Sequence, residues 1–227
     1  MYTKLFNSNS TLKEHVYNAK LCRLLYENPK RNTMMVFKKR KKCLYIVLQG
    51  TNSVFHWIHN ISFFPTKDEG LHFGFKQYAN QCKDELVNTI HNKNYHRCIN
   101  DIDTIYFTAH SLGASAIIIL IYQLLKEGLF SNYIDNLNIE IVLFGAPKSG
   151  NSYFHQNFEK VMNKYPNIRL YRYNVEYDVI KHYPPIFTYS HICNEITLYD
   201  ASVAKTDLLY NHSINCYIDC MENTLKN

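Results

Sequence analysis

The residues best suited to chemistry lie in the segment 105–114, where a β-branched and aromatic run is followed by Ser111 and Gly113. A strand that turns sharply into a helix can present a serine at its apex as a nucleophile. Such a turn needs small residues two before and two after the serine, because the two backbones approach closely. Ala109 and Gly113 meet this need, and the N-terminus of the following helix favours negative charge at Ser111. The pattern predicts a nucleophilic serine, and the alternative is a serine that only caps the helix.

A nucleophilic serine needs a base, which in turn needs an orienting acid. The carboxylates that follow Ser111 and lie at the end of a predicted strand are Glu176, Asp178 and Asp200. The candidate bases among the later histidines are His182, His191 and His212. His182 and His191 precede another predicted strand, whereas His212 opens the last predicted helix. His110 flanks the serine, but we expect its side chain to point away from Ser111.

These residues must be positioned by an alternation of strands and helices that runs from about residue 43 onward. This alternation predicts an α/β fold with a mostly parallel central sheet flanked by helices. Apolar residues at helical spacing predict helices over 12–25 and 75–90. An almost wholly apolar helix is predicted over 111–126, a polar helix over 151–164 and a final helix over 211–222. Strands are predicted over 33–37, 43–48, 104–108, 139–144 and 169–175. The sequence has no internal repeat and no linker, so we expect residues 1–227 to form a single domain.

The formal net charge of +6 is modest, and much of it lies in the run 38–42 between two predicted strands. We expect this run to be a solvated hairpin connection whose charges oppose edge-to-edge association. The alternatives are attraction to an anionic membrane surface and a nuclear-import patch. No aromatic interleaving accompanies the run, so we expect no nucleic-acid partner.

Targeting and redox signals are weak. The longest apolar stretch, residues 114–125, is shorter than the ~20 residues of a membrane-spanning helix. The first ten residues lack an apolar core and a cleavage site. The seven cysteines are irregularly spaced and lack a Cys-x-x-Cys pair, which indicates reduced thiols and no zinc site. We expect a cytoplasmic protein, with peripheral association to a membrane as an option.

Three further segments carry recognisable motifs: residues 45–60, 71–75 and 143–154. Together with the segment around Ser111, they resemble the class 3 (fungal-type) triacylglycerol lipases of the α/β-hydrolase superfamily. The resemblance extends over residues 12–222 and keeps the family's order of motifs. It implies an α/β-hydrolase fold with a short helical lid, and a serine carboxylic-ester hydrolase that cleaves acylglycerols or related lipid esters.

The resemblance assigns a role to each chemical residue. Ser111 corresponds to the nucleophile, Asp178 to the acid that follows the next strand, and His212 to the base, in the order that the superfamily keeps. Asn211 stands where the family usually has Asp. His191, the main rival of His212, lies in a segment that resembles a structural motif of the family.

The same resemblance implies an oxyanion hole and a mechanism. The hydroxyl of Thr51 and the backbone N–H groups of Thr51 and Leu112 would bind the developing oxyanion. Gln49 replaces the arginine that is usual before this hydroxyl residue. His212 would remove the proton of Ser111, and water would hydrolyse the acyl-enzyme. This mechanism needs neither a metal nor an organic cofactor.

The segment 52–64 follows Thr51 and corresponds to the lid of the family. Phe55 and Ile58 recur at helical spacing, with Trp57 beside them. The resemblance implies that these side chains cover the site in water and turn outward onto lipid, which predicts peripheral contact with a membrane or lipid-droplet surface. The alternative is an ordinary surface helix whose apolar face joins the core.

Two other classes of function compete with the ester hydrolase. One is a catalytically silent lipase-fold scaffold, because a fold does not fix a function. The other is a phospholipase or an acyltransferase that uses the same three residues. The sequence leaves the acyl chain length and the oligomeric state open.

Overall fold

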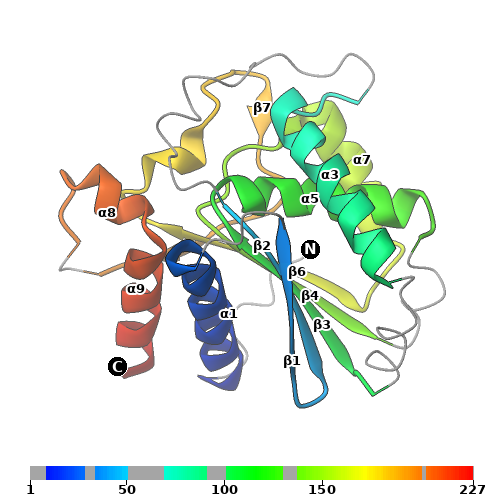
Figure 1. Cartoon of the computed structure of the whole chain (residues 1–227). Helices are drawn as coiled ribbons and strands as arrows, with labels where there is room; N and C mark the ends of the chain where they lie inside the picture. The colour runs from blue at the N-terminus through cyan, green and yellow to red at the C-terminus, as the bar shows by residue number, and fades with distance from the viewer. Residues whose placement is uncertain are drawn as a thin grey trace.

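The computed structural model describes residues 9–28, 34–50, 69–90, 101–129, 137–200 and 203–226. Its centre is a six-stranded sheet with the order β1-β2-β3-β4-β6-β8 (Figure 1). The strands of this sheet are β1 (Met35–Arg40), β2 (Cys43–Leu48), β3 (Thr104–His110), β4 (Asn138–Phe144), β6 (Ile168–Val175) and β8 (Ile196–Leu198). The pair β1–β2 is antiparallel and all other neighbours are parallel. The predicted mostly parallel sheet is therefore confirmed.

Helices cover both faces of the sheet (Figure 1). They are α1 (Asn9–Glu27), α3 (Phe73–Ile90), α5 (Leu112–Lys126), α7 (Ser152–Met162), α8 (Leu208–His212), α9 (Ile214–Lys226) and the 3₁₀ helix η1 (Val179–His182). Helix α1 packs on α9, while α5 packs on α3 and α7. Two separate apolar clusters result, one on each face of the sheet.

Strand β2 shows why the sheet is buried on both faces. Side chains alternate along a strand, so neighbouring residues enter opposite clusters. Ile46 belongs to the cluster under α3 and α5, whereas Tyr45 and Val47 belong to the cluster under α1 and α9. Helix α5 is buried around almost its whole circumference, as its nearly continuous apolar sequence predicts.

The basic run differs in part from the expected hairpin connection. Strand β1 continues through Arg40, so only Lys41 and Lys42 remain for the turn, and Lys41 adopts a positive φ of 54°. Acidic partners neutralise part of the run: Arg40 binds Glu14 at 2.6 Å, Lys42 lies 3.3 Å from Asp103, and Lys39 lies 3.8 Å from Asp101. The turn precedes β2, and the carbonyl of Lys42 accepts from the backbone N–H groups of Asp103 and Thr104 at the start of β3. The turn therefore lies at the end of the sheet opposite to Ser111.

The C-terminal helix differs from the expected single helix over 211–222. Ser213 adopts extended backbone angles (φ −70°, ψ 143°) and divides the segment into α8 and α9. The Ser213 hydroxyl accepts a hydrogen bond from the N–H of Cys216 at 3.3 Å, which satisfies a donor at the start of α9. His212 therefore ends α8 instead of opening the last helix.

Strand β8 follows His191, where a further strand was predicted. The sequence missed other short elements, namely η1 and the small antiparallel pair β5 (Gly150–Asn151) and β7 (Tyr189–Ser190). Each is four residues or shorter. Within the described ranges, no helix combines the length and the apolar character that crossing a membrane requires.

Candidate active site

Ser111 lies between the end of β3 and the start of α5, at a sharp turn. Its φ of 60° and ψ of −129° lie in a region that residues with a side chain rarely adopt. The backbone N–H of Ser111 donates to the carbonyl of Phe144 at 2.9 Å, which ties the turn to the end of β4. The Ser111 side chain makes no capping hydrogen bond to α5. The helix-cap alternative is therefore wrong.

Gly113 explains why small residues surround the serine. A Cβ atom at this position would lie 2.9 Å from the carbonyl oxygen of Gln49 and 3.1 Å from the Cβ of Ala109. The first turn of α5 thus packs directly on the ends of β2 and β3. The methyl group of Ala109 fits this contact, whereas a larger side chain at either position would force the backbones apart.

Ser111, His212 and Asp178 form a continuous hydrogen-bonded series. His212 Nδ1 lies 2.8 Å from Asp178 Oδ2, and His212 Nε2 lies 2.9 Å from Ser111 Oγ. A carboxylate oxygen only accepts, so Nδ1 carries the proton of a neutral ring and Nε2 accepts from the serine hydroxyl. All three side chains are buried. This is the arrangement that allows a histidine to deprotonate a serine.

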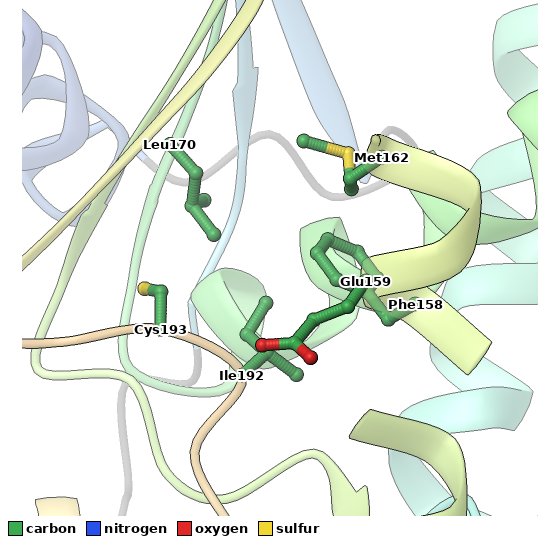
Figure 2. A pocket seen from close by; sticks show the side chains of 6 residues that line it. All are labelled: Phe158, Glu159, Met162, Leu170, Ile192 and Cys193. Carbon is green, nitrogen blue, oxygen red and sulfur yellow. The ribbon is translucent and has the colours of Figure 1, made fainter. Parts of the chain in front are cut away.

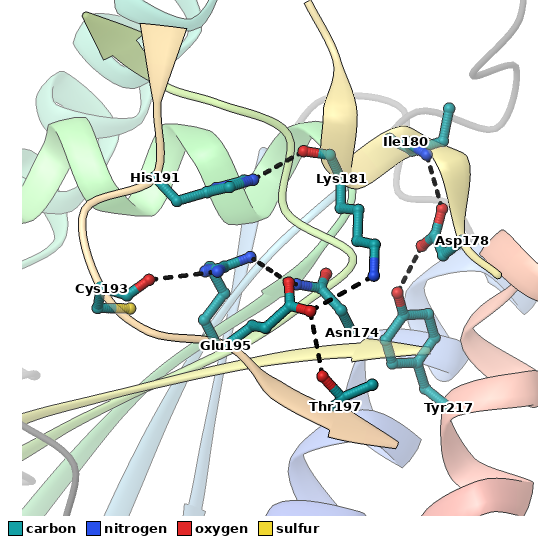
Figure 3. A network of polar contacts seen from close by, with 10 residues as sticks. Asn174, Asp178, Ile180, Lys181, His191, Cys193, Glu195, Thr197 and Tyr217 are labelled. Atoms are coloured by element: carbon teal, nitrogen blue, oxygen red, sulfur yellow. Dashed lines mark hydrogen bonds and ion pairs between the residues drawn. The ribbon is translucent and has the colours of Figure 1, made fainter. Parts of the chain in front are cut away.

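Asp178 is held by two further donors. Tyr217 Oη donates to Asp178 Oδ2 at 2.5 Å, and the backbone N–H of Ile180 donates to Oδ1 at 2.9 Å (Figure 3). Asp178 is the N-cap of η1, so the helix that follows fixes the carboxylate. Gly145, with a φ of 56°, packs against the same carboxylate and against His212.

The competing acids and bases lie elsewhere. His191 Nε2 donates to the carbonyl of Lys181 at 2.7 Å (Figure 3), and its burial, reinforced by the charge of Arg172, lowers the pKa of His191 to about 3. Asp200 accepts from the side chain of Asn223 at 2.7 Å. Glu176 is exposed. Of the candidate acids and bases, the structure brings Asp178 and His212 together with Ser111, as the resemblance implied.

A polar network supports the segment between β6 and β8. Glu195 accepts from Asn174 at 3.0 Å and from Lys181 at 3.4 Å (Figure 3). Arg172 donates to the carbonyl of Cys193 at 3.2 Å. Lys181 belongs to η1, the helix that Asp178 caps. The network therefore anchors the element that carries the carboxylate.

The expected oxyanion hole is described only in part, and the expected lid, residues 52–64, lies outside the described residues. Leu112 follows Ser111 as the first residue of α5, so its backbone N–H belongs to the unpaired donors of the first turn. Thr51, Phe55, Trp57 and Ile58 lie outside the described residues. The described range 34–50 ends at Gly50. A Cβ atom added to Gly50 would lie 2.8 Å from the carbonyl oxygen of His110. The strand that leads to Thr51 thus ends against the turn that carries Ser111.

A small apolar cavity of about 10 Å³ lies apart from these residues, between α7 and β6 (Figure 2). It is lined by Phe158, Glu159, Met162, Leu170, Ile192 and Cys193. This volume is about that of one water molecule, and the lining offers few polar partners. The cavity is therefore a packing defect and not a binding site.

Three residues around the site were missed at the sequence level: Tyr26, Gly145 and Tyr217. No local pattern marks the tyrosines, because each meets its partner across a long sequence separation. Gly145 follows a predicted strand and lies in the motif segment 143–154, but neither signal assigned it a role at the site. In the described part of the chain, no group of three or more His, Cys, Asp or Glu residues is arranged to hold a metal.

A mostly parallel sheet with a serine at a strand-to-helix turn, followed along the chain by an aspartate and a histidine, defines an α/β-hydrolase. Residues 45–188 match the family model described as Lipase (class 3). The chain belongs to the class 3 lipase family, and the resemblance seen in its motifs is confirmed.

Among curated proteins, a lipase of Rhizomucor miehei is 28% identical over 190 residues, which cover 79% of this chain and 47% of the relative. The chain thus spans about half the length of this relative. Among solved structures, the Rhizomucor miehei lipase propeptide complex aligns with a TM-score of 0.64 and 22% identity over 86% of this chain and 70% of the other. Lip2 lipase from Yarrowia lipolytica aligns with a TM-score of 0.62 and 19% identity over 85% and 80%. Both structures show that the fold is shared.

Proposed function

We propose that this protein is a serine carboxylic-ester hydrolase that cleaves acylglycerols or related lipid esters. The observation that supports this most is the buried series from Ser111 Oγ to His212 at 2.9 Å and from His212 to Asp178 at 2.8 Å. Membership of the class 3 lipase family points to an ester as the substrate.

The proposed reaction has two stages. As Ser111 Oγ attacks the ester carbonyl carbon, His212 Nε2 accepts the hydroxyl proton, and Asp178 stabilises the resulting imidazolium. The tetrahedral intermediate collapses to an acyl-enzyme when His212 gives that proton to the leaving alcohol. Water then attacks the acyl carbon with His212 as base, which releases the acid and restores Ser111. The N–H of Leu112, together with Thr51, would bind the oxyanion, and one such donor contributes ~10²–10³ in rate.

Exposed apolar side chains beside the site support contact with a lipid surface. Val179 directly follows Asp178 and is 41% exposed, and on α8 Leu208 is 41% and Leu209 is 69% exposed. Helix α8 packs against η1, so these side chains belong to adjoining elements. The basic run 38–42 lies at the opposite end of the sheet, so it would not hold this face against an anionic surface.

Labelling with a fluorophosphonate probe tests whether the protein is an enzyme. Wild type should react at one site, and Ser111→Ala should not react, because the probe captures an activated serine. Absence of labelling in the wild type would favour the scaffold. Turnover on a panel of acylglycerols and phospholipids then identifies the substrate, and added alcohols reveal acyl transfer by forming new esters.

The proposed lid requires a separate test. Trp57→Ala should impair hydrolysis of an emulsified long-chain ester far more than that of a dissolved short-chain ester, because Phe55, Trp57 and Ile58 would bind the lipid surface. Rates are measured across the solubility limit of one ester. A smooth saturation curve with equal losses on both substrates would contradict the lid.

A further inference from the structure

His110 directly precedes Ser111 and is buried, yet its side chain binds other groups. Its Nε2 lies 2.7 Å from the backbone carbonyl oxygen of His212, and its Nδ1 lies 2.7 Å from the hydroxyl of Tyr26. His110 therefore connects the turn that carries the nucleophile with the backbone of the base.

The two contacts determine a single tautomer of His110. A carbonyl oxygen only accepts, so Nε2 carries the proton and donates to His212. In a neutral ring Nδ1 is then an acceptor, and the hydroxyl of Tyr26 donates to it. Burial, reinforced by the nearby His212, lowers the pKa of His110 well below its ordinary value, so the ring stays neutral. Without the Tyr26 hydroxyl, the proton could move to Nδ1 and leave two acceptors facing each other.

Tyr26 belongs to α1 and contacts a third element as well. A Cβ atom added to Gly50 would lie 2.0 Å from the Tyr26 hydroxyl, so only glycine at the end of β2 allows this approach. The ring of Tyr26 meets that of His110 edge to face, with centroids 5.6 Å apart. Tyr26 is thus packed against both the end of β2 and the His110 ring.

The carbonyl that His110 binds is that of His212, at the end of the short helix α8. Helix α8 has five residues, and a helix of this length has little stability of its own. Carbonyl groups in the last turn of a helix lack intrahelical partners. His110 supplies a donor to one of them, at the residue whose side chain must reach Ser111.

We propose that Tyr26 and His110 are positioning residues that act together to hold the backbone of His212, so that Nε2 of His212 remains directed at Ser111 Oγ. This inference rests on the proposed function, because it assigns His212 as the base. Misplacement of a reacting group by about 1 Å can cost ~10²-fold in rate, so a loosened His212 backbone has a measurable effect.

Two replacements of His110 separate this role from simple packing. The amide nitrogen of glutamine can take the place of Nε2, so His110→Gln keeps a donor for the His212 carbonyl. Asparagine reaches only the place of Nδ1, so His110→Asn loses that donor. The readout is the second-order rate of Ser111 labelling by a small soluble fluorophosphonate, which requires no lipid surface. We expect His110→Asn to slow labelling by about 10²-fold and His110→Gln by less than about tenfold.

Tyr26→Phe provides an independent variant that removes only a hydroxyl. It should slow labelling by about tenfold when His110 is present and have little effect when His110 is replaced by Gln, whose donor needs no tautomer control. Denaturant midpoints, measured for every variant, identify losses that come from unfolding.

The outcomes distinguish this inference from the proposed function. Equal slowing by His110→Gln and His110→Asn, or equal effects of Tyr26→Phe in both backgrounds, would overturn the positioning role while leaving the hydrolase intact. A wild-type protein that the probe fails to label would overturn the proposed function and this inference with it.

Discussion

In the proposed reaction, the proton of Ser111 passes to His212, so the loss of either residue should stop ester hydrolysis. We expect Ser111→Ala and His212→Ala each to lower the kcat of ester hydrolysis by about 10⁶-fold, and the double variant to be scarcely worse, because residues that act as a unit are non-additive. Hydrolysis of a soluble chromogenic ester measures the effect. The control is His191→Ala, since His191 binds the carbonyl of Lys181 and not the serine. Loss with His191→Ala and survival with His212→Ala would reverse the assignment.

Asp178 fixes the tautomer of His212 through an oxygen that only accepts. An asparagine can present an N–H to His212 Nδ1 and so favour the wrong tautomer. Asp178→Asn should therefore leave the fold intact and lower turnover by about 10⁴-fold. The matched control is Asp200→Asn, whose partner Asn223 lies outside the series. A loss below tenfold for Asp178→Asn would mean that another carboxylate is the acid.

At the scale of elements, the loop after β4 packs closely against the site at Gly145. A Cβ atom at Gly145 would lie 2.9 Å from Tyr217 Oη, 3.0 Å from Asp178 Oδ2 and 3.1 Å from His212 Cε1. We expect Gly145→Ala to lower kcat by about 10²-fold, because the carboxylate and the imidazole must shift. Steady-state kinetics on a soluble ester measure this loss.

Gly128 is a matched control for this prediction. It has a similar φ of 67°, but an added Cβ would meet no atom within 4 Å. Both alanine variants should lose about 1 kcal/mol of stability through backbone strain, and only Gly145→Ala should lose activity. Equal kcat values for the two variants would contradict the close packing at Gly145.

The sequence predicts an element well when the residues that determine it lie close together in the chain, and poorly when the element depends on packing. The turn at Ser111 was predictable because its requirements, small residues at 109 and 113, lie within five residues of chain. The break at Ser213 was not, because the apolar pattern continues across it and the backbone change depends on packing. Strands β5 and β7 have two residues each, which is too short for periodicity to detect.

The tyrosines that support the site contact residues that are still farther away in the sequence. Tyr217 meets Asp178 across 39 residues, and Tyr26 meets His110 across 84. Such contacts exist only after the sheet brings β3, β6 and the terminal helices together. The resemblance to a family pointed to the three residues of the buried hydrogen-bonded series, whereas the residues that hold them emerged only from the folded arrangement.

At the scale of the whole molecule, buried neutral histidines make stability depend on pH. Burial lowers the pKa of His72 to about 4, and His72 Nδ1 accepts from the N–H of Phe75 at 3.3 Å. Between pH 6.5 and 4 the unfolded chain binds a proton that the native state rejects, so the free energy of unfolding falls as pH falls. One pKa unit corresponds to about 1.4 kcal/mol, so His72 contributes a loss on the order of 3 kcal/mol across this interval.

His72→Asn tests this dependence. Asparagine is a good N-cap and can accept from the same N–H at the start of α3, but it does not titrate. The slope of unfolding free energy against pH, measured by urea denaturation between pH 4 and 7, should become shallower in the variant. His191 and His110 contribute in the same direction, so part of the slope should remain. An unchanged slope would mean that His72 is protonated in the native state.

The burial of α5 on nearly all sides has a consequence for the order in which the chain is synthesised. Helix α5 ends at Lys126, yet β4, α7 and β6, which complete its surroundings, begin only at Asn138, Ser152 and Ile168. Translation therefore produces α5, the most apolar of the described helices, when only some of the segments that shield it exist. A nascent chain that pauses in this interval exposes a mostly apolar helix of 15 residues. Such exposed apolar surface can bind chaperones and can nucleate aggregation.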